Sequence, residues 1–184
     1  KIDRSHFNIF YSETKPTRPT EELMLGTNGV SAIRPPLNIA PDSILNVRTQ
    51  YRIDRDISIL TVNPHMHLLG TNFLAYALTS NGDTIPLINI PRWDFRWQYF
   101  YTFKVMQKIP KGSIIVAEGT FDNTGNNPNN PYNPPREIIE RQDLDGAGMR
   151  TTDEMFQFII TFLDYHEGDE QISLEPENRS LIKN

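Results

Sequence analysis

Residues 57–90 read ISILTVNPHMHLLGTNFLAYALTSNGDTIPLINI, and this stretch decides the fold. It opens with two apolar runs of strand length, residues 57–69 and 73–78. The turn sequence Ser-Asn-Gly-Asp follows at 80–83, and Asn-Gly between two apolar runs is the strongest short-range signal of a β-hairpin. Residues 84–90 supply the returning strand. The stretch therefore predicts antiparallel β-structure.

The same strand periodicity continues on both sides of this stretch. Upstream, apolar and polar residues alternate strictly over 47–53, as in a strand with one solvated face. Downstream, aromatic residues alternate with polar ones over 93–103, and we expect that stripe to pack in the core. Residues 113–121 and 155–163 predict two further strands. About eight short strands with little helix predict an all-β protein, an antiparallel β-sandwich or jelly roll.

The remaining segments have turn and loop composition. Residues 12–46 contain five prolines and predict an extended connection, while Asn, Pro and Gly dominate a long loop at 122–135. We therefore expect an extended N-terminal segment at 1–45, a jelly-roll domain at 46–167 and a polar C-terminal tail at 168–184. The first twelve residues alternate like a strand, which we expect to be the last strand of a preceding domain.

Composition narrows the classes of function. The 184 residues are 38% hydrophobic and 22% charged, as in an ordinary globular domain. The net charge of -5 and the lack of a Lys/Arg cluster argue against a nucleic-acid partner. There is no cysteine, so disulfides and thiolate ligands are excluded, and no apolar run is long enough to span a bilayer. The chain opens on Lys1 without a signal-peptide pattern, so we expect a fragment of a longer protein.

Three side chains form the candidate site, His65, His67 and Met155. Residues i and i+2 of a strand share a face and lie about 6.5–7 Å apart, so the two imidazoles can converge on one ion. In the run 155–163, Met155 has the opposite parity to the phenylalanines and so points away from their face. Two imidazoles with a thioether favour copper over zinc. The competing interpretation is a structural His pair and a core methionine, which are the commoner uses of such residues.

Two motifs in their order along the chain resemble a known family. Residues 65–70 (HMHLLG) and 152–155 (TDEM) are similar to the catalytic-copper, C-terminal domain of the copper type II, ascorbate-dependent monooxygenases, which include peptidylglycine alpha-hydroxylating and dopamine beta-monooxygenases. The resemblance covers about 46–165, and several further segments look like bacterial members. It implies that His65, His67 and Met155 bind the catalytic copper. Dioxygen would be activated there and a C–H bond hydroxylated, with ascorbate as the external reductant.

The resemblance also implies parts that lie outside this chain. The family's preceding domain carries a second, electron-transferring copper, and Phe10 stands where the third histidine ligand of that copper is expected. We therefore expect a missing N-terminal domain of the same chain as a partner. The resemblance further implies an extracytoplasmic location, which is periplasmic, surface or secreted. It leaves the substrate open between a small molecule and a peptide.

Two other classes compete with a copper-dependent monooxygenase that acts as part of a longer chain. One is a non-catalytic copper-binding or structural β-sandwich module of a larger extracytoplasmic protein, and a pair of histidines in an upstream domain would argue against it. The other is a zinc or iron jelly roll of the cupin kind. That class places a glutamate a few residues beyond the His pair, whereas residues 68–77 contain no acidic residue.

Overall fold

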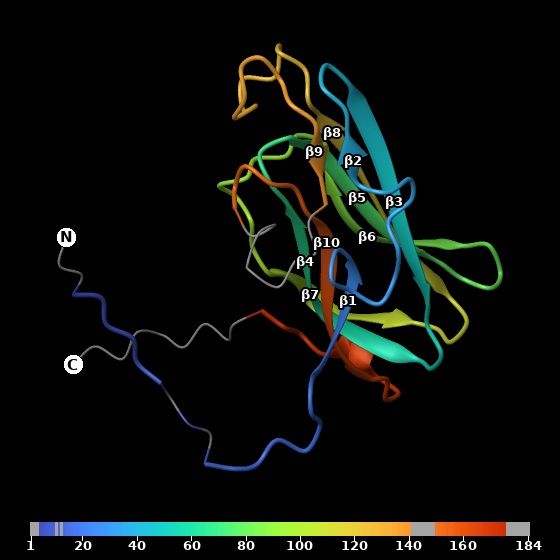
Figure 1. Ribbon diagram of the computed structural model, residues 1–184. Coiled ribbons are helices and arrows are strands. Elements are labelled where there is room, and N and C mark those ends of the chain that lie inside the picture. The colour runs from blue at the N-terminus through green and yellow to red at the C-terminus, as the bar shows by residue number, and fades with distance from the viewer. Residues whose placement is uncertain (1–3, 10, 12, 141–149, 176–184) are drawn as a thin grey trace.

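The computed structural model describes residues 4–9, 11, 13–140 and 150–175 and is built almost entirely of antiparallel strands (Figure 1). In chain order these are β1 (Glu21–Gly26), β2 (Asn38–Ile39), β3 (Ile44–Arg52), β4 (Ile57–Met66), β5 (Gly70–Leu78), β6 (Thr84–Ile90), β7 (Tyr101–Ile109), β8 (Ile114–Asp122), β9 (Ile138–Ile139) and β10 (Phe156–Asp164), followed by the 3-10 helix η1 (Asp169–Gln171). Among the described residues, no helix has the length and apolar character to cross a membrane. The all-β prediction is confirmed.

The strands form two four-stranded sheets that share one core. The first sheet has the order β1-β10-β4-β7 and the second β3-β8-β5-β6, while β2 and β9 form a separate short pair. The core is aromatic at its centre, because Phe73 of β5 lies 5.3 Å from the ring of Phe156 and 5.7 Å from that of Phe158, both on β10. These contacts join one sheet to the other, so the predicted sandwich is confirmed.

The predicted hairpin is also present. Strands β5 and β6 pair directly, and the amide of Thr79 donates to the carbonyl of Asp83 across the turn. Gly82 has a φ of 89°, a left-handed conformation that glycine adopts without steric cost. The Asn-Gly signal therefore identified both the turn and its chemistry.

The aromatic run 93–103 is the clearest error of the strand prediction. Strand β7 begins only at Tyr101, and of the earlier aromatic residues Trp93 is buried, whereas Trp97 is 64% and Tyr99 52% exposed. The reason is topological, because the chain here leaves β6 in one sheet and enters β7 in the other. A segment that crosses from one sheet to the other has no continuous face against the core, so alternation of aromatic and polar residues in it does not predict which side chains are buried.

The N-terminal part of the chain differs from expectation in two ways. Residues 21–26, interpreted as extended connection, form β1, which pairs with β10 and buries Leu25 in the core. Residues 4–9 form no strand, and Phe7, Ile9 and Tyr11 are exposed where this segment runs away from the sandwich (Figure 1). Pairing with a preceding domain stays a prediction for this segment, and Phe10 lies outside the described residues.

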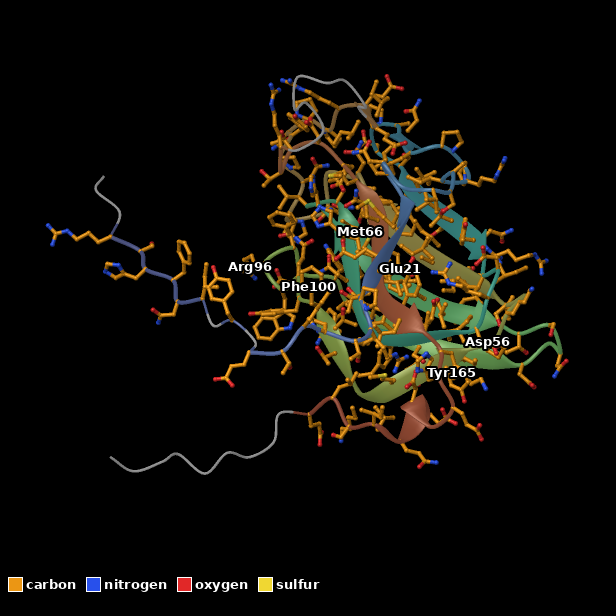
Figure 2. All side chains as sticks on the ribbon, turned by 90° about the horizontal axis from the view of Figure 1, so that it is seen from below. Glu21, Asp56, Met66, Arg96, Phe100 and Tyr165 are labelled. Carbon is orange, nitrogen blue, oxygen red and sulfur yellow. The ribbon has the colours of Figure 1, made fainter. Side chains whose placement is uncertain are left out.

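Strands β4 and β10 run side by side through the first sheet and bring two distant parts of the chain together at each end. Figure 2 shows Asp56 and Tyr165 close together at one end, where the Tyr165 amide donates to the Asp56 carbonyl at 3.1 Å, and Met66 at the other. At the Asp56 end, the buried Asp169 carboxylate accepts hydrogen bonds from both terminal nitrogens of Arg18, each at 2.8 Å, and from the hydroxyl of Ser58 at 2.6 Å. These bonds hold the pKa of Asp169 well below its usual range, with the Arg18 hydrogen bond as the main cause.

Candidate metal centre

The two histidines lie at the Met66 end of β4 and face away from the core. Met66 between them is fully buried, so strand alternation puts His65 and His67 together on the outer face of the first sheet. Their Nε2 atoms are 3.2 Å apart, and the two rings stand perpendicular with centroids 5.0 Å apart. A metal–imidazole bond is about 2.0–2.1 Å long, so one ion can reach both nitrogens at this separation. The predicted convergence of the imidazoles is thus present.

The state of each imidazole suits a metal ligand. His67 Nδ1 lies 2.8 Å from the carbonyl oxygen of Asp153. Because a carbonyl only accepts, Nδ1 carries the proton, which leaves the lone pair of His67 on Nε2. Burial lowers the pKa of His65, and the neighbouring His67 lowers it further. The His65 ring is therefore held toward the neutral form that binds metals.

Met155 lies next to His67 across the strand pair. The register of β10 against β4 aligns Phe156 with Met66 and Gln157 with His65, so the next step of the same register sets Met155 against His67. Met155 is 3% exposed, although it has the parity of the outer face. Its neighbours Asp153 and Glu154 both bond to His67, which ties this segment to the His pair independently of the register.

Glu154 clamps the turn that follows β4, and the sequence analysis did not identify it. Its two carboxyl oxygens accept the amide protons of His67 at 3.0 Å and Leu69 at 2.7 Å. The side chain is 1% exposed, and no ion pair involves it within the described part of the chain. Burial raises the pKa of Glu154 to about 8, against the opposing effect of backbone hydrogen bonds from Leu69, His67 and Met155. Its place beside Met155 in the TDEM motif was the available signal.

The loop 91–100 forms a wall of the site rather than the core stripe that its sequence predicts. Trp93 Nε1 donates to the His67 carbonyl at 3.2 Å, and the Phe95 ring stands edge-on to the His67 ring at 5.6 Å. Gln98 lies close enough to His65 to raise its pKa against the larger effect of burial. Gln98 Oε1 is buried and has no hydrogen bond of full geometry among the described residues, so the effect of Gln98 on His65 is the one interaction shown for this oxygen.

The donor set decides which metal the site can hold. Among the described residues, no group of three His, Cys, Asp or Glu side chains is arranged to bind an ion. A third protein ligand at the His pair would be of another kind, and by strand parity Met155 is the candidate thioether on this face. Two imidazoles and a thioether suit copper, whereas zinc in proteins takes Cys, His and carboxylate ligands. The residues present thus fit copper.

Comparison with known families agrees with this chemistry. The family model of the copper type II ascorbate-dependent monooxygenase, C-terminal domain, matches residues 22–130, which is more than half of the chain. The matched range includes both histidines and the loop 91–100, and it ends before Met155. A search of curated proteins found no match. The chain belongs to the C-terminal domain family of the copper type II, ascorbate-dependent monooxygenases.

Proposed function

We propose that this chain is the catalytic-copper domain of a monooxygenase and that His65, His67 and Met155 are the copper ligands. One observation carries the proposal, the 3.2 Å approach of the two Nε2 atoms on the face that Met155 shares. Copper bound there would supply the electron with which dioxygen is activated for hydroxylation of a C–H bond. The family is ascorbate-dependent, so an ascorbate-type compound is the proposed external reductant.

The surrounding residues prepare the ligands for that role. The Asp153 carbonyl keeps the proton of His67 on Nδ1, and Glu154 fixes the backbone from which the ring projects. Trp93, Phe95 and Gln98 border the histidines on the loop side, so the site is walled by largely apolar groups. The buried Gln98 Oε1 can accept a hydrogen bond from His65, the contact by which Gln98 raises the pKa of that ring. Together these contacts fix the tautomer of His67 and the orientation of its ring.

Titration with cuprous ion tests the ligand assignment. We expect about one equivalent to bind, and either His67→Ala or Met155→Leu to weaken binding at least about 100-fold, which exceeds the effect of losing a mere outer-shell partner. Met24→Leu is the matched control, because Met24 is another methionine of this sheet and contacts Gln157, the cross-strand partner of His65. Unchanged affinity in Met155→Leu, or a loss in Met24→Leu, would reject the assignment of Met155.

The complete reaction is proposed to need the domain that precedes this one. The family describes a C-terminal domain, and the exposed residues Phe7, Ile9 and Tyr11 offer an apolar segment that could pair with a preceding fold. We also propose an extracytoplasmic location for the whole protein. Ascorbate-dependent oxygen uptake by the longer chain, with and without His67→Ala, tests catalysis. If copper binds but no oxygen is consumed, the chain is a copper-binding module instead.

A further inference from the structure

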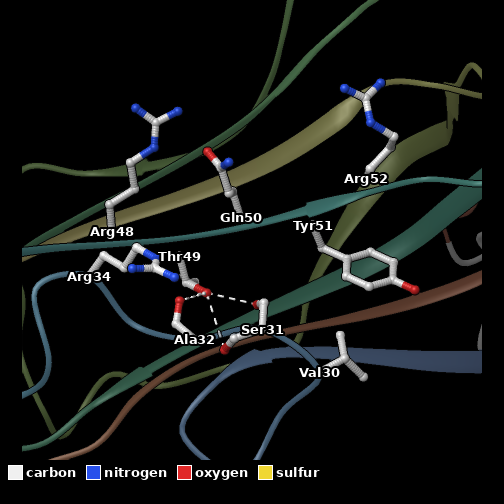
Figure 3. A pocket seen from close by; sticks show the side chains of 9 residues that line it. All are labelled: Val30, Ser31, Ala32, Arg34, Arg48, Thr49, Gln50, Tyr51 and Arg52. Atoms are coloured by element: carbon white, nitrogen blue, oxygen red, sulfur yellow. Dashed lines mark hydrogen bonds between the residues drawn. The ribbon is translucent and has the colours of Figure 1, made fainter.

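A groove of 580 Å³ lies beside β3 in the second sheet, between that strand and residues 30–34 (Figure 3). Several of its polar groups already have partners within the chain. Arg48 is 3.6 Å from Glu118, and Arg52 donates a hydrogen bond to the Gly112 carbonyl. A ligand in this groove would have to displace these contacts, whereas the contacts around the two histidines orient the candidate metal ligands themselves.

Three hydrogen bonds hold His67, and they come from two sides of the residue. On the β10 side, Glu154 accepts the His67 amide proton at 3.0 Å, and the Asp153 carbonyl oxygen lies 2.8 Å from His67 Nδ1. On the side of the loop 91–100, the indole Nε1 of Trp93 donates to the His67 carbonyl at 3.2 Å. Trp93 thus holds the peptide group that follows the His67 side chain.

Trp93 is itself fixed in place, so its hydrogen bond has a defined direction. Its backbone amide donates to the Thr71 carbonyl at 2.8 Å, and its ring lies 6.2 Å from that of Phe73, tilted by 33°. The side chain is buried, whereas Trp97 in the same loop is 64% exposed. A buried indole usually places its N–H on a hydrogen-bond acceptor, and the acceptor here is the carbonyl of a candidate metal ligand.

Gly70, the first residue of β5, leaves the space that the indole of Trp93 occupies. A methyl group at this position would lie 3.0 Å from Trp93 Cδ1, 3.0 Å from Met66 Cβ and 2.9 Å from Met66 Cε. Carbon atoms in contact prefer about 3.5–4.0 Å, so the indole would have to withdraw by a few tenths of an ångström. Its hydrogen bond of 3.2 Å is already at the long end of the normal range and would weaken first.

We propose that Trp93 and Gly70 are positioning residues, which set the direction of the His67 imidazole through the His67 carbonyl. This inference rests on the proposed function, in which His67 is a copper ligand. Without the Trp93 bond, the peptide group after His67 is free to rotate, and the ring moves with it. The contact of Nδ1 with the Asp153 carbonyl then weakens, so a proton can move to Nε2. A protonated Nε2 has no lone pair for a metal.

The substitution Trp93→benzothienylalanine tests the hydrogen bond, because this analogue keeps the shape of tryptophan but has sulfur in place of the N–H group. The chain has two tryptophans, so the replacement is made in the Trp97→Phe variant, which serves as the reference. We expect cuprous affinity to fall about tenfold, as for an outer-shell partner of a metal ligand. Gly70→Ala in the same reference should give a similar loss. Gly125→Ala, whose added methyl group meets nothing within 4 Å, should give none.

The metal-free chain gives a second readout, which a merely structural role of Trp93 would not change. NMR of the imidazole nitrogens should show His67 protonated on Nδ1 in the reference and a larger share of the Nε2-protonated tautomer after either replacement. Urea denaturation of the same variants measures the accompanying change in stability. Lowered stability with an unchanged tautomer and unchanged cuprous affinity would show that Trp93 only packs the core, and would overturn the proposal. If the analogue does not yield folded protein, Trp93→Phe removes the same donor.

Combining the two replacements separates the two contacts of Gly70. If Gly70 acts through the indole, Gly70→Ala should cost no further affinity once the Trp93 N–H is absent. A further loss would show that it acts through Met66, and would reject the role of Gly70. Failure of the copper assignment has a different signature, because His67→Ala would then leave cuprous affinity unchanged while the tautomer shift in the metal-free chain persists. If His67→Ala abolishes binding but neither replacement changes tautomer or affinity, only the role of Trp93 and Gly70 is rejected.

Discussion

Strands β4 and β10 are joined at each end by a buried carboxyl group, and the two ends are held in opposite ways. At the Asp56 end, Asp169 is 2% exposed and bonds to the guanidinium of Arg18 and the hydroxyl of Ser58. At the histidine end, Glu154 is 1% exposed and, among the described residues, accepts hydrogen bonds from the backbone amides of His67, Leu69 and Met155. The pKa of Asp169 is accordingly lowered, mainly by the Arg18 hydrogen bond, whereas burial raises that of Glu154.

This difference suggests that one end of the β4–β10 pair serves stability and the other serves function. The Asp169 carboxylate is neutralised by the guanidinium of Arg18, and this ion pair attaches the N-terminal segment to the sandwich. Glu154 has no cation in the described part of the chain, and its hydrogen bonds act on the backbone that carries His67. A buried acid without a partner costs free energy, and such costs occur at sites where a ligand supplies the compensation. We therefore propose that the histidine end is the one completed by a bound ion.

The largest expected effect lies at the Asp169 end. Arg18→Met leaves the buried carboxylate without its cation and should lower the free energy of unfolding by about 3 kcal/mol. Arg55→Met is the control, since Arg55 pairs with three carboxylates but its side chain is 43% exposed, and it should cost less than about 1 kcal/mol. Urea denaturation measures both. Copper affinity should stay unchanged in each, and equal costs in the two variants would remove the distinction between the ends.

The next effect lies at the histidine end. Glu154→Gln keeps the shape of the side chain but replaces one of its two acceptors by an amide group, which faces an amide donor. We expect cuprous affinity to fall about 10–100-fold, as for other outer-shell partners of a metal ligand. Titration measures this, with Glu22→Gln on the exposed face of β1 as the control. Unchanged affinity together with lowered stability would mean that Glu154 only supports the fold.

The smallest expected effect is the contribution of Asp169 to the pH dependence of stability. Its folded pKa is lowered, so below an unfolded pKa of about 3.9 the unfolded chain binds a proton that the folded chain does not. Stability is thus present at neutral pH and lost as pH falls, by about 1 kcal/mol between pH 7 and pH 3 from this group. Denaturant melts of the native protein and Asp169→Asn across this range give the difference. A difference that does not narrow toward low pH would contradict the assignment.

Local sequence determined the β-architecture and half of the candidate site. The hairpin at 80–83 was readable because Asn-Gly sets both backbone and register within four residues. The His pair was readable for the same reason, since strand alternation alone puts i and i+2 on one face. The parity of Met155 against Phe156 and Phe158, which are both buried in the core, was also predictable, and its role as a ligand stays a prediction. Each of these inferences depends on neighbours in the chain.

The tertiary structure alone decided which distant strands pair and which partners the buried carboxyl groups meet at the strand ends. Strand β1 escaped prediction because its pairing is with β10, more than a hundred residues away, and the aromatic run 93–100 was misread because the chain changes sheets there. Glu154 and Asp169 gained their opposite roles only from which groups the fold brought to them, Arg18 at one end and bare amides at the other. Periodicity reports which face a residue takes, but the partners across a strand pair are set by register, and register is a property of the assembled sheet.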